Sequence, residues 1–259
     1  MKEVINFMKK AILLLHGFAT NKTDFDPIID ELNNLYDHVE CHNLPGHNGE
    51  PRLKGFTAHA TMKYVDNAIS KLEKKYDIID VLGFSMGGAL GTYVAANYKV
   101  RKLILLAPAN VFLNAKYPLI RIKQFIQYLD AKTNNKSNSE EIIKEYELVL
   151  KEDEDAMKIT KKFILPNYNI RTIRQFVEVI KSCKENMKPI SSQTLVILGD
   201  MDQLVPEKTE SYIAKYTKDL TVIKFKNVSH MMLRSKKSKQ LIHAIIEFIK
   251  KEDNNDESN

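Results

Sequence analysis

The sequence predicts an α/β fold, a mostly parallel central sheet with helices on both faces and one helical insertion. Short runs rich in Leu, Ile and Val alternate with longer amphipathic stretches, as expected for parallel strands joined by crossover helices. With 259 residues, 44% of them hydrophobic and 28% charged, the chain is long enough to bury a sizeable core. The alternation stops once, between about residues 110 and 189, where helical periodicity continues without a convincing strand.

Each strand is expected where a short apolar run is bounded by polar or turn-forming residues. The six runs are 10–15, 38–43, 78–83, 102–107, 194–199 and 221–226. Each helix is expected where the apolar residues recur at helical spacing between two of these strands. The five stretches are 24–35, 61–75, 86–97, 207–216 and 236–251.

The domain organisation follows from these elements. Residues 1–109 and 190–251 form the core, and residues 110–189 form the helical insertion, whose polar middle at 134–139 is predicted to be a loop. The segment 252–259 carries four acidic residues and no basic one, so we expect a disordered acidic tail.

Charge and cysteine content exclude several function classes. The net charge is +6, and six basic residues lie between Lys224 and Lys239, but we interpret them as a solvated face and expect no nucleic-acid partner. Cys41 and Cys183 are far apart, which disfavours a disulfide framework and a thiolate zinc site. The apolar run 11–15 is too short for a signal peptide or a membrane span, so we expect a soluble cytoplasmic protein without stable membrane insertion.

The strongest motif is Gly83-Phe84-Ser85-Met86-Gly87, which directly follows a predicted strand and directly precedes a small-residue helix. In a G-x-S-x-G turn of this kind, the glycines permit a strained backbone and close helix packing, and the serine hydroxyl is exposed at the carboxyl edge of the sheet. Ser85 is therefore the candidate nucleophile. The alternative is a structural glycine turn that happens to contain a serine.

A serine hydroxyl needs a positioned base, and the base needs an orienting acid. Asp202 follows the fifth predicted strand and His230 follows the sixth, so both are expected at the same sheet edge as Ser85. Asp200 and Glu207 are the alternative acids, but Asp200 lies hard against the strand end and a carboxylate at Glu207 also suits the start of a helix.

Taken with the order Ser, Asp, His, the sequence resembles the α/β-hydrolase superfamily, near small bacterial carboxylesterases and monoacylglycerol-lipase-like serine hydrolases. The matching pieces are Leu14-Leu15-His16-Gly17-Phe18, Asn43-Leu44-Pro45-Gly46-His47, the turn around Ser85, the stretch 199–206 and Ser229-His230. The resemblance implies an α/β-hydrolase fold with a helical cap at 110–189. It also implies catalytic roles for Ser85, Asp202 and His230, with the backbone N–H groups of Phe18 and Met86 forming the oxyanion hole.

The other histidines have simpler interpretations. We expect His16 and His47 to brace loops near the site, and His243 to lie on a helix face. His38, Glu40 and His42 alternate in a predicted strand, which allows a metal site on one face, although an ordinary strand is the preferred interpretation. The sequence has no G-x-G-x-x-G fingerprint, which disfavours a nucleotide cofactor. We predict no metal and no cofactor.

The insertion carries apolar side chains that could line an acyl pocket or could simply pack the cap against the core: Phe112, Leu113, Tyr117, Leu119, Ile120, Phe125 and Tyr128. Three features depart from the family pattern. Asn48 replaces a glycine common after the Pro-Gly-His turn, the chain contains no Trp, and Ala89 occupies a position where lyases of menaquinone synthesis often carry an arginine.

The predicted function is hydrolysis of carboxylic esters, with short or medium acyl chains or of monoacylglycerol type, through an acyl-enzyme on Ser85. Alternatives with the same triad are peptide or amide cleavage, as in iminopeptidase-like relatives, and carbon–carbon or lyase chemistry. A non-catalytic ligand-binding protein is a further alternative, which an intact Ser, Asp and His disfavours. The expected partner is a small-molecule ester, and the sequence does not specify an oligomeric state.

Overall fold

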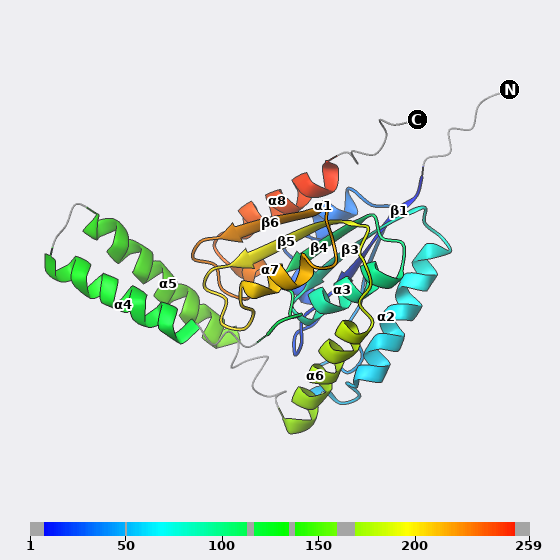
Figure 1. The fold of residues 1–259 in the computed structure, drawn as a ribbon, viewed down its shortest axis with the longest axis horizontal. Coiled ribbons are helices and arrows are strands. Elements are labelled where there is room, and N and C mark those ends of the chain that lie inside the picture. The colour runs from blue at the N-terminus through cyan, green and yellow to red at the C-terminus, as the bar shows by residue number, and fades with distance from the viewer. Residues whose placement is uncertain (1–7, 50, 113–116, 135–137, 160–168, 252–259) are drawn as a thin grey trace.

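The structure is a computed structural model that describes residues 8–49, 51–112, 117–134, 138–159 and 169–251. Its centre is a six-stranded sheet in the order β2-β1-β3-β4-β5-β6, in which every neighbouring pair is parallel (Figure 1). The strands are β1 (Lys10–Leu15), β2 (His38–Cys41), β3 (Ile78–Phe84), β4 (Lys102–Leu106), β5 (Gln193–Gly199) and β6 (Leu220–Phe225). The predicted α/β class and the six strands are confirmed, each strand to within two residues at its ends.

Helices cover both faces of the sheet. On one face lie α1 (Ile29–Asn33) and α8 (Ser238–Lys250), and on the other lie α2 (Ala58–Glu73), α3 (Met86–Asn97) and α7 (Lys208–Ile213) (Figure 1). The part of the chain that the structure describes also has three short 3-10 helices, η1 (Lys22–Phe25), η2 (Pro51–Leu53) and η5 (Met232–Arg234). None of the helices in the described part of the chain is long and apolar enough to cross a membrane.

The continuous helix predicted over residues 24–35 is wrong. The structure has the 3-10 helix η1 there, followed by the short helix α1 from Ile29 to Asn33. Pro27 lies at the break: it has no N–H to donate, and the next residue, Ile28, leaves helical geometry with φ of −122° and ψ of −6°. The predicted helix 61–75 instead begins at Ala58, where the Thr57 side chain accepts a hydrogen bond from the N–H of Ala60.

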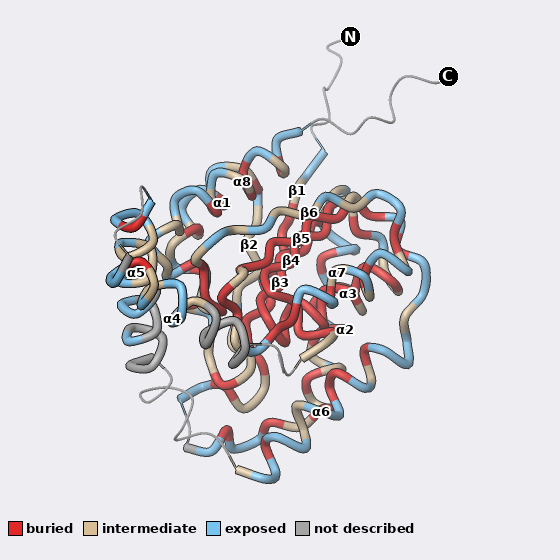
Figure 2. The backbone as a smooth tube through the Cα atoms, turned by 60° about the vertical axis from the view of Figure 1, so that its left-hand side comes forward, coloured by how far each residue is buried: buried red, intermediate tan, exposed pale blue. Residues whose placement is uncertain are grey.

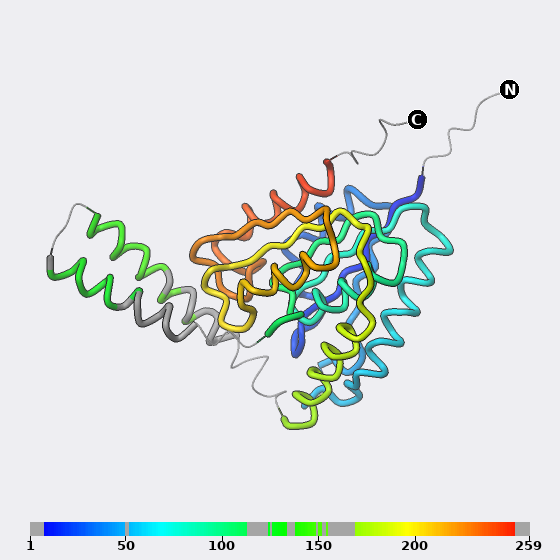
Figure 3. Tube along the Cα trace, viewed as in Figure 1, coloured from blue at the N-terminus to red at the C-terminus, as the bar shows by residue number. Residues whose placement is uncertain are grey.

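Among the described residues, three helices lie between β4 and β5. They are α4 (Tyr117–Asn134), α5 (Ser139–Ile159) and α6 (Ile170–Glu185). Helices α4 and α5 pack together as an antiparallel pair that extends beyond the sheet, whereas α6 packs against α2 and α3 (Figures 1 and 3). Residues 135–137 of the loop predicted at 134–139 and the whole tail predicted at 252–259 lie outside the described residues.

Burial is concentrated in the sheet and in α3. The described side chains of β4 are all buried, and so is nearly all of β3, β5 and α3 (Figure 2). Strands buried on both faces read as continuous apolar runs, which explains why they are visible in the sequence. This rigid centre ends, at the carboxyl edge of the sheet, in the loops that hold the candidate active site.

Candidate active site

Ser85 lies in a sharp turn between β3 and α3. Its backbone has φ of 54° and ψ of −114°, a conformation that is strained for a residue other than glycine. A Cβ atom on Gly87 would lie 1.8 Å from the carbonyl oxygen of Leu15, and one on Gly83 would lie 2.2 Å from that of Gly87. Glycine is therefore required at both positions, and the strained turn presents the Ser85 hydroxyl at the sheet edge.

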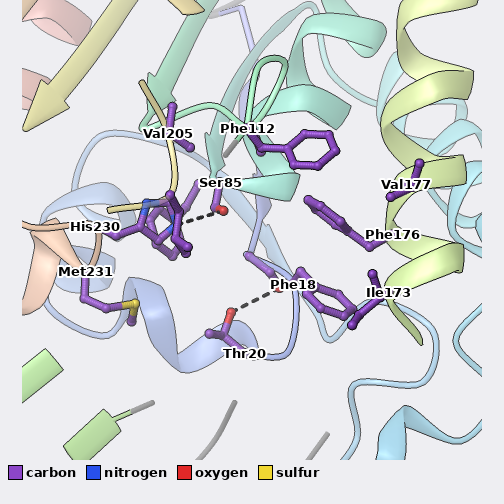
Figure 4. Close-up of a pocket in the computed structure, with 14 residues that line it drawn as sticks. Phe18, Thr20, Ser85, Phe112, Ile173, Phe176, Val177, Val205, His230 and Met231 are labelled. Atoms are coloured by element: carbon purple, nitrogen blue, oxygen red, sulfur yellow. Dashed lines mark hydrogen bonds between the residues drawn. The ribbon is translucent and has the colours of Figure 1, made fainter. Parts of the chain in front are cut away.

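The structure brings Ser85, His230 and Asp202 into one chain of hydrogen bonds. His230 Nε2 lies 2.9 Å from Ser85 Oγ (Figure 4), and His230 Nδ1 lies 2.8 Å from Asp202 Oδ2. With the ring proton on Nδ1, that N–H donates to the carboxylate and Nε2 accepts from the serine hydroxyl. The three residues follow β3, β5 and β6, whose carboxyl ends share one edge.

The two candidate acids at the end of β5 have different partners. Asp202 faces His230, and its other oxygen, Oδ1, accepts hydrogen bonds of 2.8 Å from the N–H groups of Leu204 and Val205. Asp200 instead accepts a 2.7 Å hydrogen bond from the N–H of Asn227, and burial raises the pKa of its carboxyl. Asp202 is thus fixed against the imidazole, whereas Asp200 fixes the turn that leads to His230.

The predicted oxyanion donors lie on either side of the serine. Met86 is the first residue of α3, where backbone N–H groups have no acceptor within the helix. Phe18 follows β1, the neighbour of β3 in the sheet, and its ring lies in the wall of the same cavity as Ser85. The two N–H groups therefore come from the two loops that border the Ser85 hydroxyl, and their role as donors stays a prediction.

His16 and His47 are buried braces of the loop that contains Phe18. His16 accepts from the N–H of Leu44 through Nε2 and donates through Nδ1 to the carbonyl of Gly17, both over 2.8 Å. His47 accepts from the N–H of Ala19 in the same way, over 3.3 Å. Burial lowers the pKa of His16 to about 3 and that of His47 to about 4, so both rings are neutral at pH 7.

A cavity of about 260 Å³ opens beside Ser85 and His230 (Figure 4). Among the described residues that line it, the polar side chains are those of Thr20, Ser85 and His230. The apolar side chains of the lining are Phe18, Phe84, Ala109, Phe112, Ile173, Phe176, Val177, Leu204, Val205 and Met231. Within this lining, the ring centroid of Phe176 lies 5.0 Å from that of Phe18 and 5.2 Å from that of Phe112.

The apolar residues proposed from sequence for this pocket have different outcomes. Phe112 lines the cavity, but Tyr128 does not, because its ring stacks on Tyr146 at 4.6 Å within the α4–α5 pair. The side chains of Leu113, Tyr117, Leu119, Ile120 and Phe125 lie outside the described residues. The sequence reasoning missed the wall formed by Ile173, Phe176 and Val177 of α6, whose apolar spacing indicated a helix but not which of its faces meets the cavity.

The remaining sequence candidates lie elsewhere. The imidazoles of His38 and His42 both contact Glu40, but no group of three or more His, Cys, Asp or Glu among the described residues is arranged to hold a metal. His243 lies in α8, as expected. In the basic stretch, four side chains already have protein partners, and these are Lys224, Lys226, Arg234 and Lys237.

Comparison with known proteins gives consistent findings. Residues 7–237 match the family described as serine aminopeptidase, S33. The chain is 32% identical over 112 residues to a pimeloyl-[acyl-carrier protein] methyl ester esterase of Neisseria meningitidis, covering 42% of this chain and 41% of that protein. It therefore spans about two fifths of the length of that relative.

Two further likenesses extend over most of the chain. Lipase 3 of a Moraxella species is 26% identical over 236 residues, covering 87% of this chain and 73% of the lipase. A monoacylglycerol lipase of Paleococcus ferrophilus superimposes with a TM-score of 0.65 at 18% identity, covering 92% of this chain and 93% of that structure. At that identity the superposition shows the fold alone, which is the α/β-hydrolase fold.

Proposed function

The chain belongs to the serine aminopeptidase S33 family, and from this premise we propose that it is a serine hydrolase that cleaves carboxylic esters. The observation that carries the proposal is the continuous hydrogen-bonded chain from Asp202 through His230 to Ser85, which ends beside an apolar cavity of about 260 Å³. The favoured substrates are esters of short or medium acyl chains, or of monoacylglycerol type. The names of the relatives, an esterase and a lipase, support this choice.

The reaction follows from the arrangement of these groups. His230 Nε2 accepts the proton of Ser85 while Oγ attacks the ester carbonyl carbon, and the resulting negative charge develops on the carbonyl oxygen. Backbone N–H groups of Phe18 and Met86 stabilise that oxygen, at about 3 kcal/mol or more for each donor. His230 then protonates the departing alcohol, and water resolves the acyl-enzyme by the same steps in reverse order.

Asp202 acts on the histidine. It keeps the proton on His230 Nδ1, so that Nε2 is the acceptor, and it stabilises the imidazolium that forms during attack. The N–H groups of Leu204 and Val205 hold the other carboxylate oxygen, so the acid cannot rotate away from the ring.

The cavity favours an uncharged acyl group over the amino terminus of a peptide. An aminopeptidase must bind the α-ammonium group of its substrate, and burying that charge without an anionic partner is costly. None of the described residues that line the cavity carries a carboxylate. Ester substrates are therefore preferred to the peptide substrates that the family description names.

We infer further that residues 110–189 serve as the cap of the site, because α6 and Phe112 from this segment form one wall of the cavity. Cytoplasmic localisation is supported by the two cysteines, Cys41 and Cys183, both of which are free. A nucleic-acid partner is disfavoured, because most basic side chains between Lys224 and Lys239 already contact protein groups.

The test is turnover of a p-nitrophenyl ester series from acetate to palmitate by the wild type and by Ser85→Ala. We expect hydrolysis of the shorter members and a loss of at least about 10³-fold in the variant. Leucine and proline p-nitroanilides form the peptidase arm of the test. Turnover of the anilides without the esters would replace the proposal with aminopeptidase activity, and absence of both, with no fluorophosphonate labelling of Ser85, would favour a binding protein.

A further inference from the structure

A second buried carboxylate lies next to the site and has no part in the proposed triad. Asp24, in η1, is 4% exposed, and its Oδ2 accepts hydrogen bonds from the Thr20 hydroxyl and, over 3.4 Å, from the N–H of Gly17. Burial raises the pKa of this carboxyl. Both donors belong to the loop that contains Phe18, so the hydrogen bonds to Asp24 fix the loop of the first predicted oxyanion donor.

The other oxygen of Asp24 faces the loop of the histidine. Asp24 Oδ1 lies 3.9 Å from Nη2 of Arg234, and the same Nη2 donates to the carbonyl and the hydroxyl of Thr23 over 3.1 and 3.2 Å. Arg234 ends η5, and the N–H of Met232 at the start of this helix donates to the carbonyl of His230 over 2.9 Å. Arg234 thus joins the histidine loop to η1.

The two loops also touch through one aromatic ring. The ring of Phe84, just before the nucleophile, has its centroid 5.1 Å from that of His230. A Cβ atom on Gly17 would lie 3.1 Å from the nearest atom of the same ring. A shift of either loop relative to the other would therefore displace the general base, the oxyanion loop and the end of the strand that holds Ser85.

We propose that Asp24 and Arg234 are positioning residues that fasten the oxyanion loop, residues 17–20, to the loop of His230. This inference rests on the proposed function. The paired side chains act through geometry, since they keep the Phe18 N–H and His230 Nε2 in a fixed relation to Ser85 Oγ. They have no direct contact with the reacting atoms in this scheme.

The expected effect is on the chemical step. Oxyanion donors act only within about 2.7–3.1 Å of the developing charge, and a displacement of about 1 Å can cost about 100-fold in rate. Binding of the acyl chain depends on apolar side chains of the cavity, which Asp24 and Arg234 do not line. Loss of the fastening contact should therefore lower kcat and leave KM nearly unchanged.

The experiment measures kcat and KM for the best p-nitrophenyl ester with Asp24→Asn, Arg234→Gln and the double variant. Arg101→Gln is the matched control, because Arg101 also pairs with a buried aspartate, Asp80, but at the opposite edge of the sheet. We expect each single variant at 24 or 234 to lower kcat about 10- to 100-fold with KM within about twofold, and the double variant to lose no more than the worse single one. The control should lower Tm and keep kcat.

Each outcome decides one question. If Arg234→Gln and Arg101→Gln lower Tm equally and both keep the wild-type kcat, Arg234 has only a structural role. If the losses of kcat in the two single variants multiply in the double variant, Asp24 and Arg234 act separately. Either result overturns the inference. Arg234 is partly exposed, so we expect Arg234→Gln to fold, and its kcat tests the inference even if Asp24→Asn does not fold. If the wild type hydrolyses no ester and fluorophosphonate does not label it, the proposed function itself has failed.

Discussion

Each end of strand β3 lies beside a buried cluster that contains an aspartate, Asp80 at the amino end and Asp202 at the carboxyl end, and the two clusters differ in how their hydrogen bonds are arranged. At the amino end, Asp80 is fully buried and accepts from the Tyr36 hydroxyl, from the Arg101 guanidinium and from the N–H of Lys102. Four donor contacts converge on one carboxylate from fixed neighbours. Burial beside Asp80 also raises the pKa of Tyr36, so the phenol remains a donor.

At the carboxyl end the hydrogen bonds form a line instead of converging. They run from Asp202 to His230 to Ser85 Oγ, and the last atom lies beside a cavity. The carboxylate of Asp80 is fully buried and accepts only from fixed protein donors in the contacts above, so we expect this cluster to stabilise the fold. A chain of hydrogen bonds that ends at a hydroxyl beside a cavity can instead transfer a proton when a substrate binds. A buried aspartate therefore serves stability at one end of the strand and, in our proposal, chemistry at the other.

The largest effect is expected when the hydrogen-bonded chain from Asp202 to Ser85 is broken. Asp202→Asn should lower kcat by about 10³- to 10⁴-fold, because the amide would favour the wrong tautomer of His230. Asp200→Asn, two positions earlier, is the matched control and should cost less than about tenfold, since Asp200 acts only through the turn at Asn227. Steady-state kinetics on both variants decide this, and the reverse ranking would transfer the role of triad acid to Asp200.

The next largest effect is expected when the cluster around Asp80 loses its arginine. Arg101→Gln leaves Asp80 buried without its cationic partner, which should lower the free energy of unfolding by about 3 kcal/mol. The measurement is urea denaturation at pH 7, with kcat determined at a temperature where the variant remains folded. A large fall in kcat of the folded variant would contradict the division between the two ends.

Low pH should lower the folding stability of the protein, because two buried histidines near the active site are neutral in the folded state. His16 and His47 have pKa values lowered by burial to about 3 and about 4, whereas in the unfolded chain they regain about 6.5. The unfolded state then binds more protons below pH 6.5, so stability falls as the pH drops from about 6.5 towards 4, by roughly 1–2 kcal/mol for each ring at pH 5. Urea denaturation at pH 7, 6 and 5 measures the slope. His59→Gln changes an exposed ring and should leave that slope as it is, while a flat wild-type curve would refute the assignment.

The sequence is most informative where local patterns decide the structure. Strands such as β3 and β5 are buried on both faces and so appear as continuous apolar runs. Ser85 directly follows β3, and Asp202 and His230 lie in the loops after β5 and β6, so their place beyond parallel strands that end at one edge identified them as site residues. The helix predicted at 24–35 is wrong because Pro27 interrupts it, although the apolar spacing around Pro27 is helical.

Features that depend on distant contacts were not predictable in the same way. The pairing of Asp24 with Arg234 joins residues far apart in the chain, and nothing in either local pattern indicates it. The placement of α6 is similar. It depends on contacts such as Arg171 with the carbonyl of Phe56 and Gln175 with the N–H of Ala58, which determine the face that α6 turns to the cavity.

The smallest expected effect tests that placement. Phe176→Ala removes the ring between Phe18 and Phe112 and enlarges the cavity, so longer acyl chains should gain relative to short ones, by about tenfold in the ratio of kcat/KM values. Tyr128→Ala is the matched control, because it removes an aromatic ring of the same inserted segment that stacks on Tyr146 outside the cavity lining. The p-nitrophenyl ester series measures both profiles. A shift in the Tyr128 variant, or none in the Phe176 variant, would mean that α6 does not size the acyl site and that the wall of the pocket lies elsewhere in the insertion.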